Sequence, residues 1–129
     1  KHHDEESDFA GETEHSFKDG TVVRTFEDFM QNAIGGVVTR ASKDLARWAV
    51  EAPLVWKDRQ TVELGSGCGL VSSALLKMGA HVTSTDLEEL LPHLEYNLSL
   101  NAEGCDGLWQ VQALDWDSPS DRAALKSKL

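Results

Sequence analysis

Cysteine, long apolar runs and basic residues are all scarce in this 129-residue sequence. Its two cysteines, Cys68 and Cys105, give neither a disulfide framework nor the spacing of a metal site, so we predict no bound metal. No apolar run approaches the roughly 20 residues of a membrane-spanning helix, and the acidic N-terminus is unlike a signal peptide, so no membrane partner is predicted. Cysteines outside a disulfide framework are expected to be thiols, which favours a reducing compartment: the cytoplasm, with the nucleus as a further location.

The shortage of basic residues limits the partners that the chain can bind. Twelve Lys and Arg residues stand against 22 Asp and Glu residues, for a net charge of −10. Without a basic stripe to neutralise phosphates, duplex nucleic acid is excluded as an expected partner. An acidic surface suits a basic partner such as a lysine-bearing protein segment, although a solubilising acidic tail explains the same charge.

The charge also divides the chain into two regions. Residues 1–20 hold seven acids and two lysines, a net of −5, and have no apolar periodicity, so we predict a flexible acidic tail there. Residues 21–129 are expected to form one domain, opening with a short ordered and more apolar stretch at 21–30.

Strand and helix patterns alternate through this domain. An amphipathic helix follows Gly35-Gly36, and its expected apolar side holds Val38, Ala41, Leu45, Trp48 and Ala49. Strands are predicted at 61–64, 81–85 and 108–113, and further helices at 70–78, at 92–100 and after Ser118 or Ser120. This order predicts an α/β fold, a Rossmann-like parallel sheet with flanking helices. Three strands leave one apolar edge of the first strand exposed, so we expect the N-terminal part of a longer protein.

A glycine-rich turn between the first strand and its helix indicates a ligand site. Gly65, Gly67 and Gly69 permit a tight turn and let a ligand approach backbone N–H groups, although a plain strand-to-helix turn would look the same. The dinucleotide fingerprint fails, because its third glycine would fall on Leu70 or Ser72.

Two carboxylates flank this turn and specify the ligand further. Glu63 lies immediately before the glycines, where it would repel a pyrophosphate and suit a cationic group such as an ammonium or sulfonium. Asp86 ends the second strand and is placed to accept hydrogen bonds from ribose hydroxyls.

Four segments together resemble a known family: Glu63–Val71, Thr83–Leu87, Leu91–Asn101 and Ala113–Trp116. They are similar to the class I, seven-strand methyltransferases that use S-adenosylmethionine. More narrowly, they resemble the non-histone protein-lysine methyltransferases of methyltransferase family 16. The resemblance covers about residues 35–117 and implies the first three strands of the class I methyltransferase fold.

The resemblance also implies roles for individual residues. Asp86 would bind both ribose hydroxyls and Leu87 would pack against the adenine, whose site Trp116 would line. Thr39 stands where family members usually carry a tryptophan beside the cofactor. A helix cap is the alternative for Asp86, and an ordinary tryptophan for Trp116. The full predicted set of cofactor-binding residues is Thr39, Glu63, Gly65, Ser66, Gly67, Asp86, Leu87, Asp115 and Trp116.

The implied activity is methyl transfer from S-adenosylmethionine to a lysine of a non-histone protein. No catalytic residue is identified, because the family's acidic motif after the fourth strand lies outside this sequence, and we expect little activity from these residues alone. Two alternatives remain open: a non-catalytic cofactor-binding or interaction module, and a methyltransferase that acts on a small molecule or RNA. The sequence carries no signal of oligomeric state.

Overall fold

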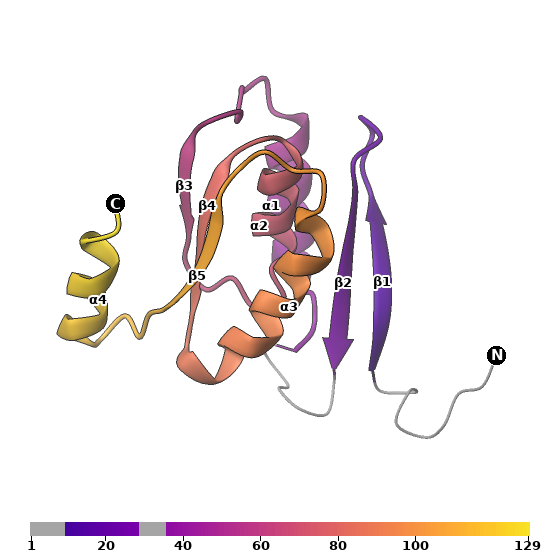
Figure 1. Ribbon diagram of the computed structural model, residues 1–129. Coiled ribbons are helices and arrows are strands. Elements are labelled where there is room, and N and C mark those ends of the chain that lie inside the picture. The colour runs from indigo at the N-terminus through magenta and orange to yellow at the C-terminus, as the bar shows by residue number, and fades with distance from the viewer. Residues whose placement is uncertain (1–9, 29–35) are drawn as a thin grey trace.

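The computed structural model describes residues 10–28 and 36–129 of the chain (Figure 1). The predicted break at Gly35 and the apolar residues Phe29 and Met30 lie outside these described residues. The described residues form these elements in chain order: β1 (Ala10–Ser16), β2 (Val22–Asp28), α1 (Arg40–Glu51), β3 (Gln60–Glu63), α2 (Leu70–Lys77), β4 (His81–Asp86), the 3-10 turn η2 (Glu88–Leu90), α3 (Leu91–Ala102), β5 (Trp109–Ala113) and α4 (Pro119–Lys126).

The predicted parallel sheet is confirmed, with strand order β3-β4-β5. Val62 of β3 pairs with Thr83 of β4, which in turn pairs with Gln110 of β5. Helices α1, α2 and α3 lie between this sheet and the β1–β2 hairpin, while α4 lies on the far side of the sheet (Figure 1). Within the described residues β3 pairs only with β4, and Val62 and Leu64 are 38% and 58% exposed, which agrees with the predicted apolar edge.

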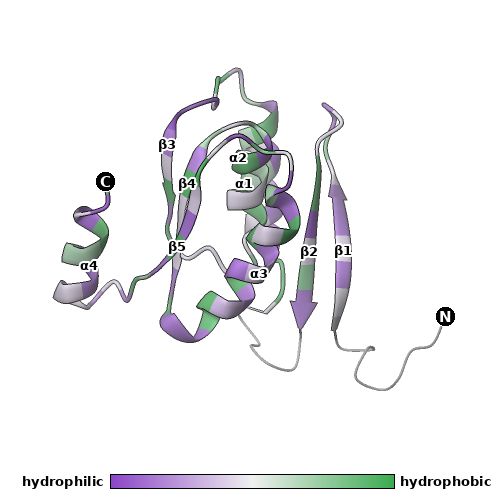
Figure 2. Cartoon of the chain, in the orientation of Figure 1, coloured by the Kyte–Doolittle hydropathy of each residue, from purple (hydrophilic) through white to green (hydrophobic). Residues whose placement is uncertain are grey.

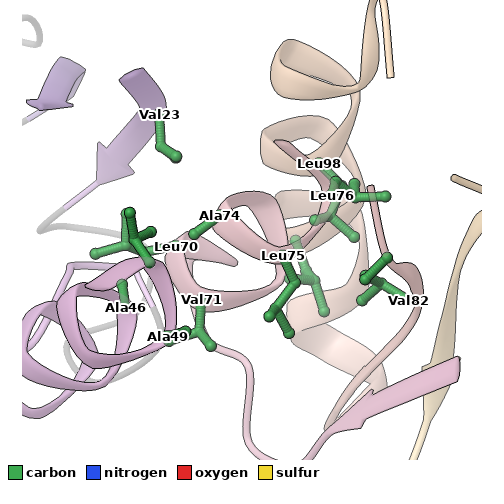
Figure 3. Packing of buried hydrophobic residues seen from close by; sticks show 13 residues of the cluster. Val23, Ala46, Ala49, Leu70, Val71, Ala74, Leu75, Leu76, Val82 and Leu98 are labelled. Atoms are coloured by element: carbon green, nitrogen blue, oxygen red, sulfur yellow. The ribbon is translucent and has the colours of Figure 1, made fainter. Parts of the chain in front are cut away.

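The hydrophobic core is centred on α2, where every residue from Leu70 to Leu76 is buried. Its neighbours include Val82 of β4 and Leu94 and Leu98 of α3, three side chains that are at most 2% exposed (Figure 3). Leu94 and Leu98 are four residues apart in α3 and therefore lie on the same face of the helix. The core therefore fixes the helices that follow the ends of β3 and β4, which are the two strand ends beside the glycine turn.

The expected buried side of α1 is confirmed at Ala49 but wrong at Ala41, Leu45 and Trp48. The residues that pack into the core are Ala46, Ala49 and Val50, whereas Leu45 and Trp48 are 48% and 54% exposed. Figure 3 shows Ala46 and Ala49 facing α2, and small side chains at this contact let the two helices approach closely. The bulkier residues lie on the outer side of the helix. There the Trp48 ring packs edge-on against the Trp56 ring, with the ring centroids 6.2 Å apart.

The prediction of a flexible tail is wrong for the described part of residues 1–20. Ala10–Ser16 forms β1, an antiparallel partner of β2 in which Thr13 pairs with Thr25. Figure 2 shows that β1 is mostly hydrophilic, which is why it has no apolar signature. Its order comes from backbone pairing and from the turn at Gly20, whose φ of +92° is a conformation that glycine adopts without steric cost. No described helix is long and apolar enough to cross a membrane.

Candidate cofactor site

A cavity of about 710 Å³ opens where the carboxyl ends of β3, β4 and β5 meet. Its position is the one that parallel α/β sheets generally use for ligands. Seven of the nine predicted cofactor-binding residues line it: Thr39, Gly65, Gly67, Asp86, Leu87, Asp115 and Trp116. Glu63 and Ser66 do not line it, so the structure brings together most of the predicted set, from four separate segments of the chain.

The carboxylate of Asp86 is held in place by two backbone amides. The Gly67 N–H donates to Asp86 Oδ2 and the Leu87 N–H donates to Asp86 Oδ1, each at 2.7 Å. Each carboxylate oxygen can accept a second hydrogen bond. Asp86 is therefore fixed in orientation and still able to accept two hydroxyl groups from a ligand in the cavity.

The glycine turn is built on left-handed backbone. Gly65, Gly67 and Gly69 have φ angles of +65°, +55° and +81°, which side chains with a Cβ adopt only at a cost. A Cβ at Gly65 would lie 3.6 Å from Cζ2 of Trp116, so the indole sits directly across from the turn. Trp116 is 64% exposed and so is available to a ligand that enters between the ring and the turn.

Ser66 has a structural role that joins the ends of β3 and β4. It is 4% exposed, its N–H donates to the Thr85 carbonyl at 2.8 Å, and its Oγ accepts from the Thr85 N–H at 3.2 Å. The same hydroxyl donates to the carbonyl of Glu63 at 3.3 Å. These bonds set the spacing between the two strand ends at which the cavity opens.

Glu63 directs one carboxylate oxygen toward α2. Its Oε1 accepts from the Ser72 hydroxyl at 2.6 Å and from the Ser72 N–H at 3.1 Å. Burial raises the pKa of Glu63, and these hydrogen bonds partly oppose that rise. The predicted contact of Glu63 with a cationic ligand stays a prediction, and in this structure the side chain ties β3 to the first turn of α2.

Thr39 combines two roles at the start of α1. It lines the cavity, and its Oγ1 accepts from the Ser42 N–H at 3.1 Å as the N-cap of the helix. A threonine provides this cap and a tryptophan cannot, because an indole carries no side-chain oxygen acceptor. Thr39 therefore orients the first turn of α1, which forms one wall of the cavity.

The cavity lining is acidic and apolar. Its charged members are Asp86, Glu89, Asp115 and Asp117, and no Lys, Arg or His occurs among the described lining residues. Apolar surface comes from Leu87 and Trp116, together with three lining residues that the sequence analysis missed, Val37, Leu90 and Leu114. Such a lining attracts cationic groups and repels phosphates.

Other missed lining residues are Ser42, Cys68, Glu89 and Asp117. All four are within three residues of a predicted one, and proximity in sequence was the signal that could have found them. Burial raises the pKa of the Cys68 thiol to about 12, so this residue is neutral and unreactive at physiological pH. No cluster of three or more His, Cys, Asp or Glu residues in the described ranges could hold a metal.

Asn97 of α3 connects the glycine turn to the hairpin. Its Nδ2 donates to the carbonyl of Cys68 at 2.8 Å and to that of Phe26 at 3.0 Å, and its Oδ1 accepts from the Phe26 N–H at 2.7 Å. The side chain is fully buried. One amide group thus fixes both the strand β2 and the turn that forms the floor of the cavity.

A family profile described as lysine methyltransferase matches residues 18–128. The chain belongs to this lysine methyltransferase family. Its α/β architecture, with a three-stranded parallel sheet and flanking helices, is consistent with part of a methyltransferase fold.

Curated relatives agree with this assignment. A bovine protein-lysine methyltransferase METTL21E is 46% identical over 66 residues, which are 50% of this chain and 23% of the relative. An EEF1A lysine methyltransferase 3 from Xenopus tropicalis is 32% identical over 111 residues, 85% of this chain and 49% of the relative. The human protein-lysine N-methyltransferase EEF2KMT is 36% identical over 95 residues, 64% of this chain and 29% of the relative. The chain thus spans half or less of the length of these relatives.

Proposed function

We propose that this chain binds S-adenosylmethionine in the cavity at the strand ends and, within a lysine methyltransferase, serves methyl transfer to a lysine of a non-histone protein. The observation that carries the proposal is the Asp86 carboxylate, which two backbone amides hold beside a glycine turn, in a cavity whose described lining includes no basic residue. The names of the relatives support a protein as the methyl acceptor.

The described residues fit this cofactor. The free acceptor positions of Asp86 suit the two ribose hydroxyls, and Leu87 and Trp116 offer apolar surface to the adenine. The left-handed turn at Gly65 and Gly67 leaves room for the methionine part, because a Cβ at Gly65 would narrow the gap to Trp116. The carboxylates of the lining complement the positive sulfonium.

The cofactor supplies an electrophilic methyl group, and the chain's own share is to position the reactants. The acidic lining raises the local concentration of a cationic lysine side chain near the cavity. We assign to these residues orientation and exclusion of water, which together lower the barrier of a reaction between two bound groups. We propose a cytoplasmic location, where the thiols of Cys68 and Cys105 stay reduced.

Isothermal titration calorimetry with S-adenosylhomocysteine tests cofactor binding. Loss of a hydrogen bond to a charged group costs about 1.5–3 kcal/mol, so Asp86→Asn should weaken binding by roughly 10- to 100-fold. Trp116→Ala removes a mostly exposed side chain and should weaken binding with little loss of stability. The matched control is Asp106→Asn, the same chemical change at an exposed acid outside the cavity, which should bind as the wild type does.

Two results would contradict the cofactor proposal. One is the absence of measurable binding by the wild-type chain. The other is equal binding by the wild type, Asp86→Asn and Trp116→Ala, which would place the ligand elsewhere.

The acceptor requires a separate experiment, in a protein of the relatives' length. Labelled methyl groups from S-adenosylmethionine are followed into the protein, RNA and small-molecule fractions of a cell extract. Label on protein lysines supports the proposal. Label confined to RNA or small molecules contradicts the acceptor class, and cofactor binding without any transfer supports a non-catalytic module instead.

A further inference from the structure

A second cavity, of about 310 Å³, lies between the turn of the β1–β2 hairpin and helix α1. Leu70, which is 2% exposed, and the partly buried Phe17 give it apolar surface. His15 also lines it and is bonded to Thr25 through Nε2 at 2.9 Å. The function proposed above makes no use of this site.

Positive charge is concentrated around this second cavity. Lys18 reaches it from the hairpin turn, and Lys43 and Arg47 reach it from successive turns of α1. Glu51 is the only acid among its described lining residues. Burial lowers the pKa of His15, the charge of Glu27 opposes this shift, and the charge of Lys43 adds to it. The net direction is downward, so we count no positive charge from His15 at pH 7. In a chain of net charge −10, this is a local reversal of sign.

The two cavities are joined by one row of side chains on α1. Thr39, Lys43 and Arg47 follow one another at intervals of four residues, which places them along the same face of the helix. Thr39 lines the first cavity, and the other two line the second. At about 1.5 Å per residue, eight residues along this helix correspond to roughly 12 Å. A peptide of a few residues can therefore contact both cavities.

We propose that the second cavity docks an acidic segment of the protein whose lysine is methylated, and this inference rests on the proposed function. The three cations attract carboxylates, while Phe17 and Leu70 accept one apolar side chain from the same segment. Arg47 donates one of its five N–H groups, from Nη2, to Asp44 at 2.8 Å and keeps the others for a partner. A phosphate group would use the same cations but leave the apolar surface of Phe17 and Leu70 uncovered, so the lining favours an acidic peptide segment. The acceptor would then carry acidic residues close to its target lysine.

Fluorescence anisotropy on the 129-residue chain tests this docking. The probe is a labelled 12-residue peptide of glutamates with one central phenylalanine, titrated at low ionic strength because exposed charges are screened by salt. We expect Lys43→Glu combined with Arg47→Glu to weaken binding by about tenfold or more, since two attractions become repulsions. The double variant should bind a control peptide, with lysine in place of each glutamate, no more weakly than the wild type does.

The matched control changes the net charge equally at a distant place. Lys126→Glu with Lys128→Glu reverses two lysines at the end of α4, which lies across the sheet from the hairpin (Figure 1). We expect this control to bind the acidic peptide within about twofold of the wild type. Equal weakening by both pairs would overturn the proposal, because it would show a response to net charge alone.

Two further outcomes complete the test. Failure of the acidic peptide to bind the wild type overturns the docking site, and displacement of the peptide by inorganic phosphate, but not by chloride at equal ionic strength, shows a phosphate site instead. S-adenosylhomocysteine is titrated into the same samples. If the wild type binds S-adenosylhomocysteine but not the acidic peptide, the docking site alone is contradicted. If the wild type does not bind S-adenosylhomocysteine, the proposed function is contradicted.

Discussion

Replacement of Asn97 by alanine should loosen both the hairpin and the glycine turn. Within the described residues, the edge of β2 that faces away from β1 is met by two asparagine side chains of α3 instead of by another strand. Asn97 exchanges two hydrogen bonds with the backbone of Phe26, at 2.7 and 3.0 Å. One helical turn later, Asn101 exchanges two with Arg24, at 2.8 and 2.7 Å. Each amide group therefore acts as one residue of a β-ladder.

The magnitude follows from the groups that would lose their partner. Asn97→Ala removes the acceptor of the Phe26 N–H and the donor to two carbonyls, those of Phe26 and Cys68. A buried polar group without a partner costs about 1–3 kcal/mol, and water that enters the vacated space recovers part of this. We expect a loss of about 3–5 kcal/mol in the free energy of unfolding, measured by urea denaturation.

Asn101→Ala is the matched control, because it removes a buried amide of the same kind from the same helix face. It should destabilise the chain by a similar amount, but it makes no contact with the carbonyl of Cys68. Both variants should therefore lose stability, while only Asn97→Ala should also weaken S-adenosylhomocysteine binding beyond what unfolding explains.

Native-state hydrogen exchange separates the two contacts at single amides. In Asn97→Ala the Phe26 amide should exchange at least about tenfold faster relative to the Arg24 amide, and Asn101→Ala should give the reverse. Equal acceleration of both amides in both variants would refute the reasoning, because the two side chains would then act only through global stability.

Three further predictions concern other parts of the molecule. Gly107→Ala should cost about 3 kcal/mol or more in urea denaturation, because its Cβ would lie 2.0 Å from a backbone oxygen, whereas Gly11→Ala, with open space around it, should be nearly neutral. Because burial raises the pKa of Glu63 above its usual 4.5, the wild type loses stability as the pH rises from 4.5 through that raised value. The free energy of unfolding of Glu63→Gln should therefore rise relative to that of the wild type over the same pH range, and a constant difference between the two would contradict this. Iodoacetamide at pH 8 should label Cys105 before Cys68, whose pKa of about 12 keeps it protonated, and equal rates by mass spectrometry would be inconsistent with its burial.

The parallel sheet could be predicted from the sequence because its strands and helices have strong local signals. The strands predicted at 61–64, 81–85 and 108–113 agree with β3, β4 and β5, and the helices predicted at 70–78 and 92–100 agree with α2 and α3. The hairpin was missed because β1 is polar on both faces and is held by pairing with β2. Asp19-Gly20, followed directly by the β-prone residues 21–26, was the available clue to a hairpin turn.

Side-chain direction was harder to predict than element type. On α1 the large apolar residues Leu45 and Trp48 suggested the buried face, but the space between α1 and α2 accepts only small ones such as Ala46 and Ala49. A helical pattern shows that a face exists, whereas the distance to the neighbouring helix decides which residues fill it.

The same limit applies to the candidate site, where Gly65, Gly67 and Asp86 line the cavity, as their positions at strand ends predict. Ser66 and Glu63 share those positions but turn their polar groups into the protein, toward Thr85 and Ser72. The sequence predicts which residues lie near the cavity, but not which of them direct their side chains toward neighbouring strands and helices. These inward hydrogen bonds explain how the cavity holds its shape. They connect the ends of β3 and β4 to each other and to the first turn of α2. A site arranged in this way loses little conformational entropy when a ligand binds. We therefore expect the affinity of the cavity for S-adenosylhomocysteine to depend on Ser66 and Ser72 as well as on Asp86, although neither serine lines the cavity.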